Sequence, residues 1–199
     1  MTVKSIALDA FGTLCEISRP RRPYAALARL TAEPHEFLKS VLTRSLSEAD
    51  LRRLVGPRAD DVAFARFSRD LCREIAFIGL FEDTIPALRE LRQRGLRIAV
   101  VSNLASPYVD SLRRLLQDSV DGFVLSCEVG LAKPDPRIFE LACAEMGSSP
   151  GTTLMVGDSL KSDVRGAADA GLKALQIERR KSTGLNSLLE LGHFLDADI

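Results

Sequence analysis

Net charge is the first thing that this sequence lacks. Its 199 residues include 27 Lys and Arg against 27 Asp and Glu, so the formal net charge is zero. A neutral chain has no overall field that would draw it to nucleic acid or to an acidic membrane surface. We therefore expect a small-molecule substrate, with no nucleic-acid partner and no membrane partner.

Paired cysteines and long apolar runs are also missing. The cysteines form no CxxC pair and have no histidine at ligand spacing, which argues against a zinc site or a disulfide framework. They are Cys15, Cys72, Cys127 and Cys143. No segment approaches the roughly 20 apolar residues of a membrane span, and the apolar run near the N-terminus is too short for a signal peptide. These absences predict a cytoplasmic protein with reduced thiols.

What the sequence does have is short apolar runs of strand length. Such runs, apolar throughout and without alternation, are typical of parallel strands buried on both faces. They lie at residues 5–8, 97–101, 122–125, 153–156 and 173–177. Helical patterns occupy residues 85–94, 106–116, 136–146, 163–170 and 185–191. The alternation predicts an α/β fold with a doubly wound parallel sheet.

One stretch, residues 15–79, interrupts this alternation. Its apolar spacing is helical over residues 24–30, 34–44, 48–54 and 58–77, and no convincing strand is found there. Ser47 and Asp50 form a capping signal for the third of these helices. We expect an α/β core domain of residues 1–14 and 80–199 and a small helical cap domain of residues 15–79. Such a cap lies over the carboxyl ends of the strands, where ligands bind.

Chemically useful side chains follow four of the predicted strands. They are Asp9, Gly12 and Thr13 in the first segment, Ser102 and Asn103 in the second, Lys133 in the third, and Asp158 with Asp163 in the fourth. Carboxylates at this spacing hold a hard cation through oxygen. Taken singly, each residue is equally typical of a turn, a helix cap or a solvated surface charge.

In this order, on successive strands, these residues resemble the four motifs of the haloacid dehalogenase (HAD) superfamily. The matching positions are Asp9 with Thr13, Ser102, Lys133, and Asp158 with Asp163. The helical insertion stands in the position of the family's C1 cap. The resemblance implies a HAD-like Rossmannoid core with a small helical cap.

The resemblance also implies a hydrolase with a carboxylate nucleophile. Asp9 would attack the substrate and form a covalent aspartyl intermediate. Mg²⁺ would be held by the carboxylates of Asp9 and Asp158 and by the backbone carbonyl of Phe11. Asp163 would orient either Lys133 or a metal-bound water.

Other residues of the motifs are expected to hold the substrate. Ser102 and Lys133, with Asn103 and the backbone amides around Gly12, would bind the phosphoryl oxygens and stabilise developing charge. Thr13 would fix the turn or the nucleophile.

Phe11 departs from the phosphatases of the superfamily. They carry a second Asp at this position, which protonates the leaving group and later activates water, a contribution of roughly 10²- to 10⁴-fold. The 2-haloacid dehalogenases resemble this chain here, because a carbon–halogen bond needs no proton on its leaving group, but they replace the metal motif that Asp158 preserves. We therefore favour a Mg²⁺-dependent phosphohydrolase that acts on a small phosphorylated metabolite.

Other interpretations stay open beside this one. The chain can be a 2-haloacid dehalogenase-like enzyme, or a catalytically weak protein that binds a phosphorylated ligand or a partner. Lys39 is the one cap lysine available for a Schiff base of the kind that phosphonoacetaldehyde hydrolase uses. Candidate replacements for the missing acid are Cys15, Glu16 and His35, and the basic run of residues 19–22 is a candidate for binding an anionic substrate tail.

Overall fold

A five-stranded parallel sheet, in the order β5-β4-β1-β6-β7, is the centre of the molecule. The computed structural model describes residues 2–181 and 184–196. The strands are β1 (Ser5–Leu8), β4 (Arg97–Ser102), β5 (Gly122–Leu125), β6 (Thr153–Gly157) and β7 (Lys173–Gln176). β1 pairs in register with β4 on one side and with β6 on the other. The predicted parallel α/β sheet is confirmed, and the carboxyl ends of β4, β1 and β6 lie side by side.

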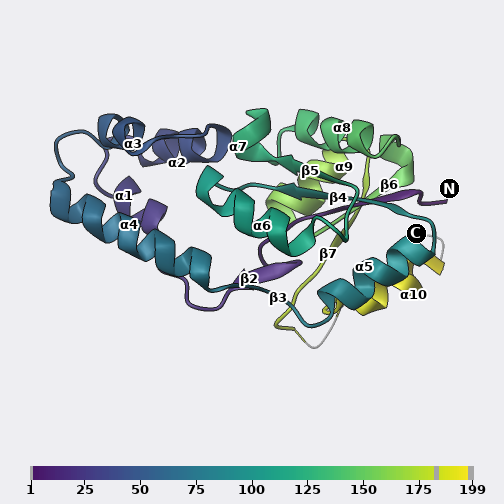
Figure 1. Ribbon diagram of the computed structural model, residues 1–199. Helices are drawn as coiled ribbons and strands as arrows, with labels where there is room; N and C mark the ends of the chain where they lie inside the picture. The colour runs from purple at the N-terminus through teal and green to yellow at the C-terminus, as the bar shows by residue number, and fades with distance from the viewer. Residues whose placement is uncertain (1, 182–183, 197–199) are drawn as a thin grey trace.

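Helices cover both faces of this sheet (Figure 1). Successive strand residues point to opposite faces, so Ala7 and Met155 pack into one apolar cluster while Ile6 and Leu8 pack into another. The first cluster includes α8 (Pro136–Glu145) and α9 (Gly166–Asp169). The second includes α5 (Thr84–Gln93), α6 (Val109–Leu116) and α10 (Leu191–Asp196). Both faces of the strands are therefore apolar, which explains the unbroken runs in the sequence.

Four helices form a separate layer at one end of the molecule, beyond the edge of the sheet (Figure 1). They are α1 (Pro23–Ala28), α2 (Pro34–Thr43), α3 (Glu48–Val55) and α4 (Asp61–Ala76). α1 packs against both α2 and α4, and α2 contacts the short helix α7 (Ser126–Val129) of the core. α3 begins with the expected capping box, in which the side chains of Ser47 and Asp50 each accept the other residue's backbone N–H. We refer to α1–α4 as the helical layer.

A two-stranded antiparallel ribbon joins the helical layer to the core. β2 (Cys15–Ile17) leaves the core and β3 (Ile78–Leu80) returns to it, with Cys15 opposite Leu80. The expectation that residues 15–79 hold no strand was therefore wrong. Each strand has three residues, and only Cys15 among the six is buried. Strands this short and this exposed leave no apolar run in the sequence.

Three expected helices differ locally from those observed. Residues 160–165 form a π-helical turn, η3 (Leu160–Arg165), so the helix expected from residue 163 begins only with α9. The segment expected at 106–116 starts as a 3₁₀ turn, η1 (Ser106–Tyr108). The last helical segment is η4 (Leu188–Glu190) followed by α10, a few residues later than expected. A further 3₁₀ turn, η2 (Pro150–Thr152), precedes β6.

No helix within residues 2–181 and 184–196 is both long and apolar enough to cross a membrane.

Candidate active site

Asp9 lies directly after β1, at the middle of the sheet's carboxyl edge. Its backbone N–H donates to the carbonyl of Val156 at 3.0 Å, which continues the pairing of β1 with β6. Ser102, the last residue of β4, donates its hydroxyl to Asp9 Oδ1 at 3.1 Å. The sheet thus holds Asp9 from both neighbouring strands, its backbone through β6 and its carboxylate through β4.

Lys133 reaches the same carboxylate from the loop that precedes α8. Its Nζ lies 2.7 Å from Asp9 Oδ1 and 2.6 Å from Asp163 Oδ1, and it also donates to the carbonyl of Val101 at 2.7 Å. Only 2% of the Lys133 side chain is exposed. Burial alone would lower the pKa of Lys133, but the charges of Asp9 and Asp163 outweigh burial and hold the pKa above its ordinary value. The lysine is therefore a fixed positive charge beside the nucleophile candidate.

The side-chain amide of Asn103 hydrogen-bonds to the backbone of Lys133. Its side-chain amide donates to the Lys133 carbonyl at 2.8 Å, and its Oδ1 accepts the Lys133 N–H at 2.7 Å. This reciprocal pair fixes the loop that carries the lysine. Asn103 therefore positions the Lys133 loop, and its expected role in substrate binding stays a prediction.

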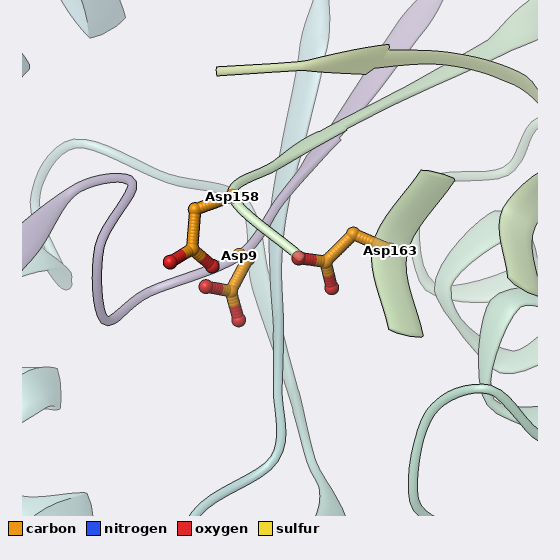
Figure 2. Close-up of side chains that lie close together, drawn as sticks. All are labelled: Asp9, Asp158 and Asp163. Atoms are coloured by element: carbon orange, nitrogen blue, oxygen red, sulfur yellow. The ribbon is translucent and has the colours of Figure 1, made fainter. Parts of the chain in front are cut away.

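Three carboxylates gather at this edge of the sheet, as Figure 2 shows. Asp9, Asp158 and Asp163 each offer a ligand oxygen, and these oxygens lie within 4.8 Å of one another. Burial, together with the negative charges of Asp9 and Asp163, raises the pKa of Asp158 to about 6. Oxygen donors around a shared negative charge suit a hard divalent cation, so the donor set fits a metal site.

Two glycines leave room for these carboxylates. A Cβ added to Gly12 would clash with the Asp158 carboxylate, and a Cβ added to Gly157 would clash with that of Asp163. Gly12 also has a φ of 89°, in the region that favours glycine. Both the backbone conformation and the close approach therefore require glycine at position 12.

The turn after Asp9 is held by backbone hydrogen bonds. The carbonyl of Ala10 accepts the N–H groups of Leu14 and Cys15 at 2.8 Å and 2.9 Å, and that of Thr13 at 3.2 Å. The N–H of Gly12 donates to the carbonyl of Cys15 at 2.7 Å, so it is not directed at a ligand as expected. The buried hydroxyl of Thr13 has no hydrogen-bond partner within the described part of the chain. Thr13 thus contributes its backbone to the turn, and its hydroxyl fixes neither the turn nor Asp9.

Phe11 lies between the carboxyl edge of the sheet, next to Asp9, and the helical layer. Its ring packs edge-on against that of Tyr108, with centroids 5.9 Å apart. It lines an apolar cavity of about 270 Å³ that also includes Tyr24 and Leu38. On the other side it lines a larger and more polar cavity of about 800 Å³ that includes Gly12 and Asp158.

The candidate proton donors differ in where they lie relative to Phe11. Cys15 is buried, and burial raises the pKa of its thiol far above the ordinary value. Glu16 is exposed and lines the larger cavity. His35 and Lys39 are exposed on α2 and line neither cavity at Phe11.

The basic run at residues 19–22 contacts Phe77 and Glu74. The guanidinium of Arg19 stacks over the ring of Phe77 at 4.7 Å. The backbone N–H groups of Arg21 and Arg22 both donate to the carboxylate of Glu74. Arg19 and Arg21 line a small hollow beside Phe77, away from Asp9, so their side chains do not line the cavities at Phe11.

Two polar groups at the site's edges were not expected from the sequence. Glu74 of α4 is buried and accepts a hydrogen bond from the Tyr108 hydroxyl at 2.6 Å, which links the helical layer to the core. Arg179, after β7, donates to the carbonyl of Thr13 and pairs with Asp83 at 2.6 Å. Both links join residues distant in the sequence, so no local pattern marks them.

This fold and this arrangement of residues define a family. Residues 3–171 match the haloacid dehalogenase-like hydrolases, and the chain belongs to that family. The resemblance of its motifs to the HAD superfamily is confirmed, as is the Rossmann-like core.

Relatives of two kinds match the chain. It is 34% identical to phosphoserine phosphatase of Thermus thermophilus over 77% of this chain, and it spans 59% of that enzyme's length. It is 29% identical to (S)-2-haloacid dehalogenase of Pseudomonas sp. (strain YL), over 99% of this chain and 90% of the dehalogenase. The crystal structure of a HAD phosphatase from Thermococcus onnurineus, 26% identical, superposes with a TM-score of 0.67 and covers 97% of this chain and 98% of that one. The names of the relatives thus include both chemistries that the first motif had left open.

Proposed function

We propose that the protein is a Mg²⁺-dependent phosphohydrolase that acts on a small phosphorylated substrate, with Asp9 as its nucleophile. The observation that supports this most directly is the acidic cluster, in which oxygens of Asp9, Asp158 and Asp163 lie within 4.8 Å of one another beside a buried lysine. So much negative charge would repel both the carboxylate of a halogenated acid and the departing halide. Phosphate monoester hydrolysis, by contrast, uses a metal cation, which these carboxylates would hold and which would neutralise their charge.

Asp9, Asp158 and the backbone carbonyl of Phe11 are the groups that would hold Mg²⁺. When bound, the cation offsets the repulsion between an anionic nucleophile and an anionic phosphate. Asp163 belongs to the same cluster, but its Oδ1 faces Lys133 at 2.6 Å and its Oδ2 accepts the N–H of Ser159 at 2.9 Å. In this proposal Asp163 orients the lysine.

The chain's own groups supply the remaining chemistry. One carboxylate oxygen of Asp9 attacks phosphorus, and the bond from phosphorus to the leaving oxygen breaks. Ser102 Oγ and Lys133 Nζ, which now contact Asp9 Oδ1 at 3.1 Å and 2.7 Å, turn to the phosphoryl oxygens and stabilise the developing charge. Water then cleaves the bond between Asp9 and phosphorus and releases inorganic phosphate. The helical layer, proposed as a cap domain of residues 15–79, shields the reaction from bulk solvent.

The test is turnover of 4-nitrophenyl phosphate by the purified chain with and without Mg²⁺. We expect hydrolysis that needs the metal and that Asp9→Asn abolishes. Asp118→Asn, at an exposed carboxylate outside the site, is the control and should leave turnover unchanged. Activity that survives Asp9→Asn, or that is indifferent to Mg²⁺, would refute the proposal. Mg²⁺-dependent protection by phosphate against heat without turnover would instead indicate a binding protein.

Dehalogenation is the second candidate, and Phe11 with its apolar cavity is the observation that favours it. Attack of Asp9 on carbon would expel halide with its electron pair, a leaving group that needs no proton. Water would then hydrolyse the Asp9 ester. Halide release from a 2-haloacid in the presence of EDTA would support this function, and its absence would remove it.

A further inference from the structure

Phe11 lines two cavities that differ in character. The larger, of about 800 Å³, contains Asp158 and has Arg180 and Lys181 on its rim. The smaller, of about 270 Å³, lies between the helical layer and the loop after β4. Phe11 is two residues from Asp9, and Asn103, which lines the smaller cavity, directly follows Ser102. The smaller cavity is therefore lined by chain neighbours of Asp9 and Ser102, two of the groups proposed for the reaction.

The walls of this smaller cavity are almost entirely carbon. Tyr24, Leu38 and Leu42 contribute from the helical layer, and Phe11 and Tyr108 contribute from the core. An apolar protein cavity of about 150 Å³ is large enough to bind benzene. A cavity of about 270 Å³ thus has space for one ring or a short branched hydrocarbon, and its walls offer nothing to the hydroxyl groups of a sugar or a polyol.

The same walls offer no proton to a departing oxygen. Asn103 uses both polar atoms of its amide on the Lys133 backbone. The Tyr108 hydroxyl already donates to Glu74 at 2.6 Å. Burial raises the pKa of the remaining hydroxyl, that of Tyr24, to about 12, so it is a poor acid at neutral pH. Phe11 itself has no ionisable group.

We infer that the substrate is an aryl or acyl phosphate with a small apolar body, whose leaving oxygen departs as a phenolate or a carboxylate without being protonated. This inference rests on the proposed phosphohydrolase function and specifies its substrate class. Asp9 forms its bond to phosphorus, the ester or anhydride P–O bond breaks, and the electron pair leaves on the phenol or carboxyl oxygen. Water next cleaves the Asp9–phosphoryl bond, giving inorganic phosphate and a proton that passes to solvent. An alkoxide is far more basic, so alkyl phosphates react slowly.

The first test varies the leaving group on the unmodified protein. With Mg²⁺ present, kcat/KM for 4-nitrophenyl phosphate should exceed that for phenyl phosphate by about 100-fold or more, since the stronger acid leaves unaided. Both substrates place the same ring in the cavity. Glycerol phosphate should be slower than either. Nearly equal kcat/KM values for the two aryl esters, or a preference for glycerol phosphate, would overturn the inference.

The second test restores a proton donor. Phe11→Asp should reduce the ratio of kcat/KM for 4-nitrophenyl phosphate to kcat/KM for phenyl phosphate by roughly tenfold or more. The change should come chiefly from a higher kcat/KM for phenyl phosphate. Phe11→Asn is the matched control, because it has the same size as Asp and cannot donate a proton of suitable acidity, and it should leave the ratio unchanged. Equal effects of the two variants would contradict the role assigned to position 11.

The third test concerns the cavity wall. Leu42→Asn should lower kcat/KM for 4-nitrophenyl phosphate at least about tenfold more than Leu42→Met does, because a polar group replaces apolar contact with the ring. Melting temperatures establish that both variants fold. Equal kcat/KM values for the two variants would exclude the cavity as the binding site for the ring.

These outcomes separate the inference from the proposed function. If no phosphate ester is hydrolysed, or if Asp9→Asn leaves turnover intact, the proposed function fails. If turnover requires Asp9 and Mg²⁺ but does not depend on the leaving group, only the substrate class is wrong.

Discussion

Lys133 has the most demanding environment of any single residue in the site. It lies between the carboxylates of Asp9 and Asp163, at 2.7 Å and 2.6 Å, and all three side chains are almost fully buried. A buried charge is tolerated only while its partners are present. The stability of the metal-free protein therefore depends on this residue as much as catalysis does.

Lys133→Met should lower the free energy of unfolding by about 3–5 kcal/mol at neutral pH, because it leaves two buried carboxylates without their cation. Urea denaturation measures this loss. Lys161→Met, at an exposed lysine of η3, is the control and should stay near the wild-type value. A Lys133→Met variant as stable as the control would contradict the ion pairs.

At the scale of residues, position in the chain predicted the members of the site but not all of their tasks. Asp9, Ser102 and Asp158 stand next to strands of one parallel sheet, whose carboxyl ends meet at one edge, so the pattern alone brings them together. Asn103 fits the same pattern, yet it uses its amide on the backbone of Lys133. The sequence shows which side chains are available near the site. It does not show that Asn103 bonds to a residue 30 positions away, because the path of the Lys133 loop decides that contact.

Among the secondary-structure elements, the start of α5 is tied to the C-terminal segment. Asp83 Oδ2 accepts hydrogen bonds from Arg179 at 2.6 Å, from the Ser187 hydroxyl at 2.7 Å and from the Leu188 N–H at 2.8 Å. Arg179 also donates to the carbonyl of Thr13, in the turn that follows Asp9. One carboxylate, through Arg179, thus joins α5 and the segment after β7 to the turn that follows Asp9.

Asp83→Asn should destabilise the protein by about 2 kcal/mol at pH 7, the scale of hydrogen bonds to a charged group. Burial alone would raise the pKa of Asp83, but its hydrogen-bond donors outweigh burial and hold the pKa below its ordinary value. Since the folded pKa is the lower one, the stabilisation is complete above about pH 4 and is lost as the pH falls through the folded pKa.

The difference between wild type and Asp83→Asn should therefore vanish in acid, which urea titrations at several pH values can follow. Asp61→Asn, whose side chain is 95% exposed, removes only a surface ion pair with Arg52 and should change stability by less than about 1 kcal/mol. A constant difference across pH would show that the Asp83 charge is not what stabilises this junction.

The elements that the sequence predicted well are those whose burial is continuous. β1, β4 and β6 are buried almost throughout, so their apolar runs identify them. The sequence did not indicate β2 and β3, because each has only three residues and 60 residues separate the two strands in the chain. The sequence did not indicate η3, because the side chains of Ser159 and Asp163 accept backbone N–H groups there and reshape the turn locally.

On the scale of the whole molecule, Glu74 is the polar link between the helical layer and the core. Its Oε2 accepts from the Tyr108 hydroxyl at 2.6 Å, while its Oε1 accepts the N–H groups of Arg21 and Arg22, where the chain enters α1. The helical layer is otherwise joined to the core through the ribbon of β2 and β3 and by apolar packing around Phe11. This buried hydrogen bond is therefore one of three kinds of contact that hold the helical layer against the core.

Tyr108→Phe should loosen this contact, because it removes a charge-assisted hydrogen bond worth about 1.5–3 kcal/mol. We expect faster amide hydrogen exchange across α4 with little change in the sheet. Tyr24→Phe is the matched control, since the Tyr24 hydroxyl makes no hydrogen bond in the described residues and its ring packs against those of Phe67 and Tyr108. Equal exchange in the two variants would mean that packing alone holds the layer in place.

Under the proposed function, the ring of Phe11 also affects the relative rates of the two chemical steps. A phenyl group accepts protons no better than it donates them, so nothing at that position activates the water that must free Asp9. Release of the leaving group would then be faster than hydrolysis of the phosphorylated aspartate. Product would appear as a burst equal to the amount of protein, followed by a slow steady state. During turnover most molecules would carry phosphate, and transfer of that phosphate to an acceptor better than water would compete with its hydrolysis.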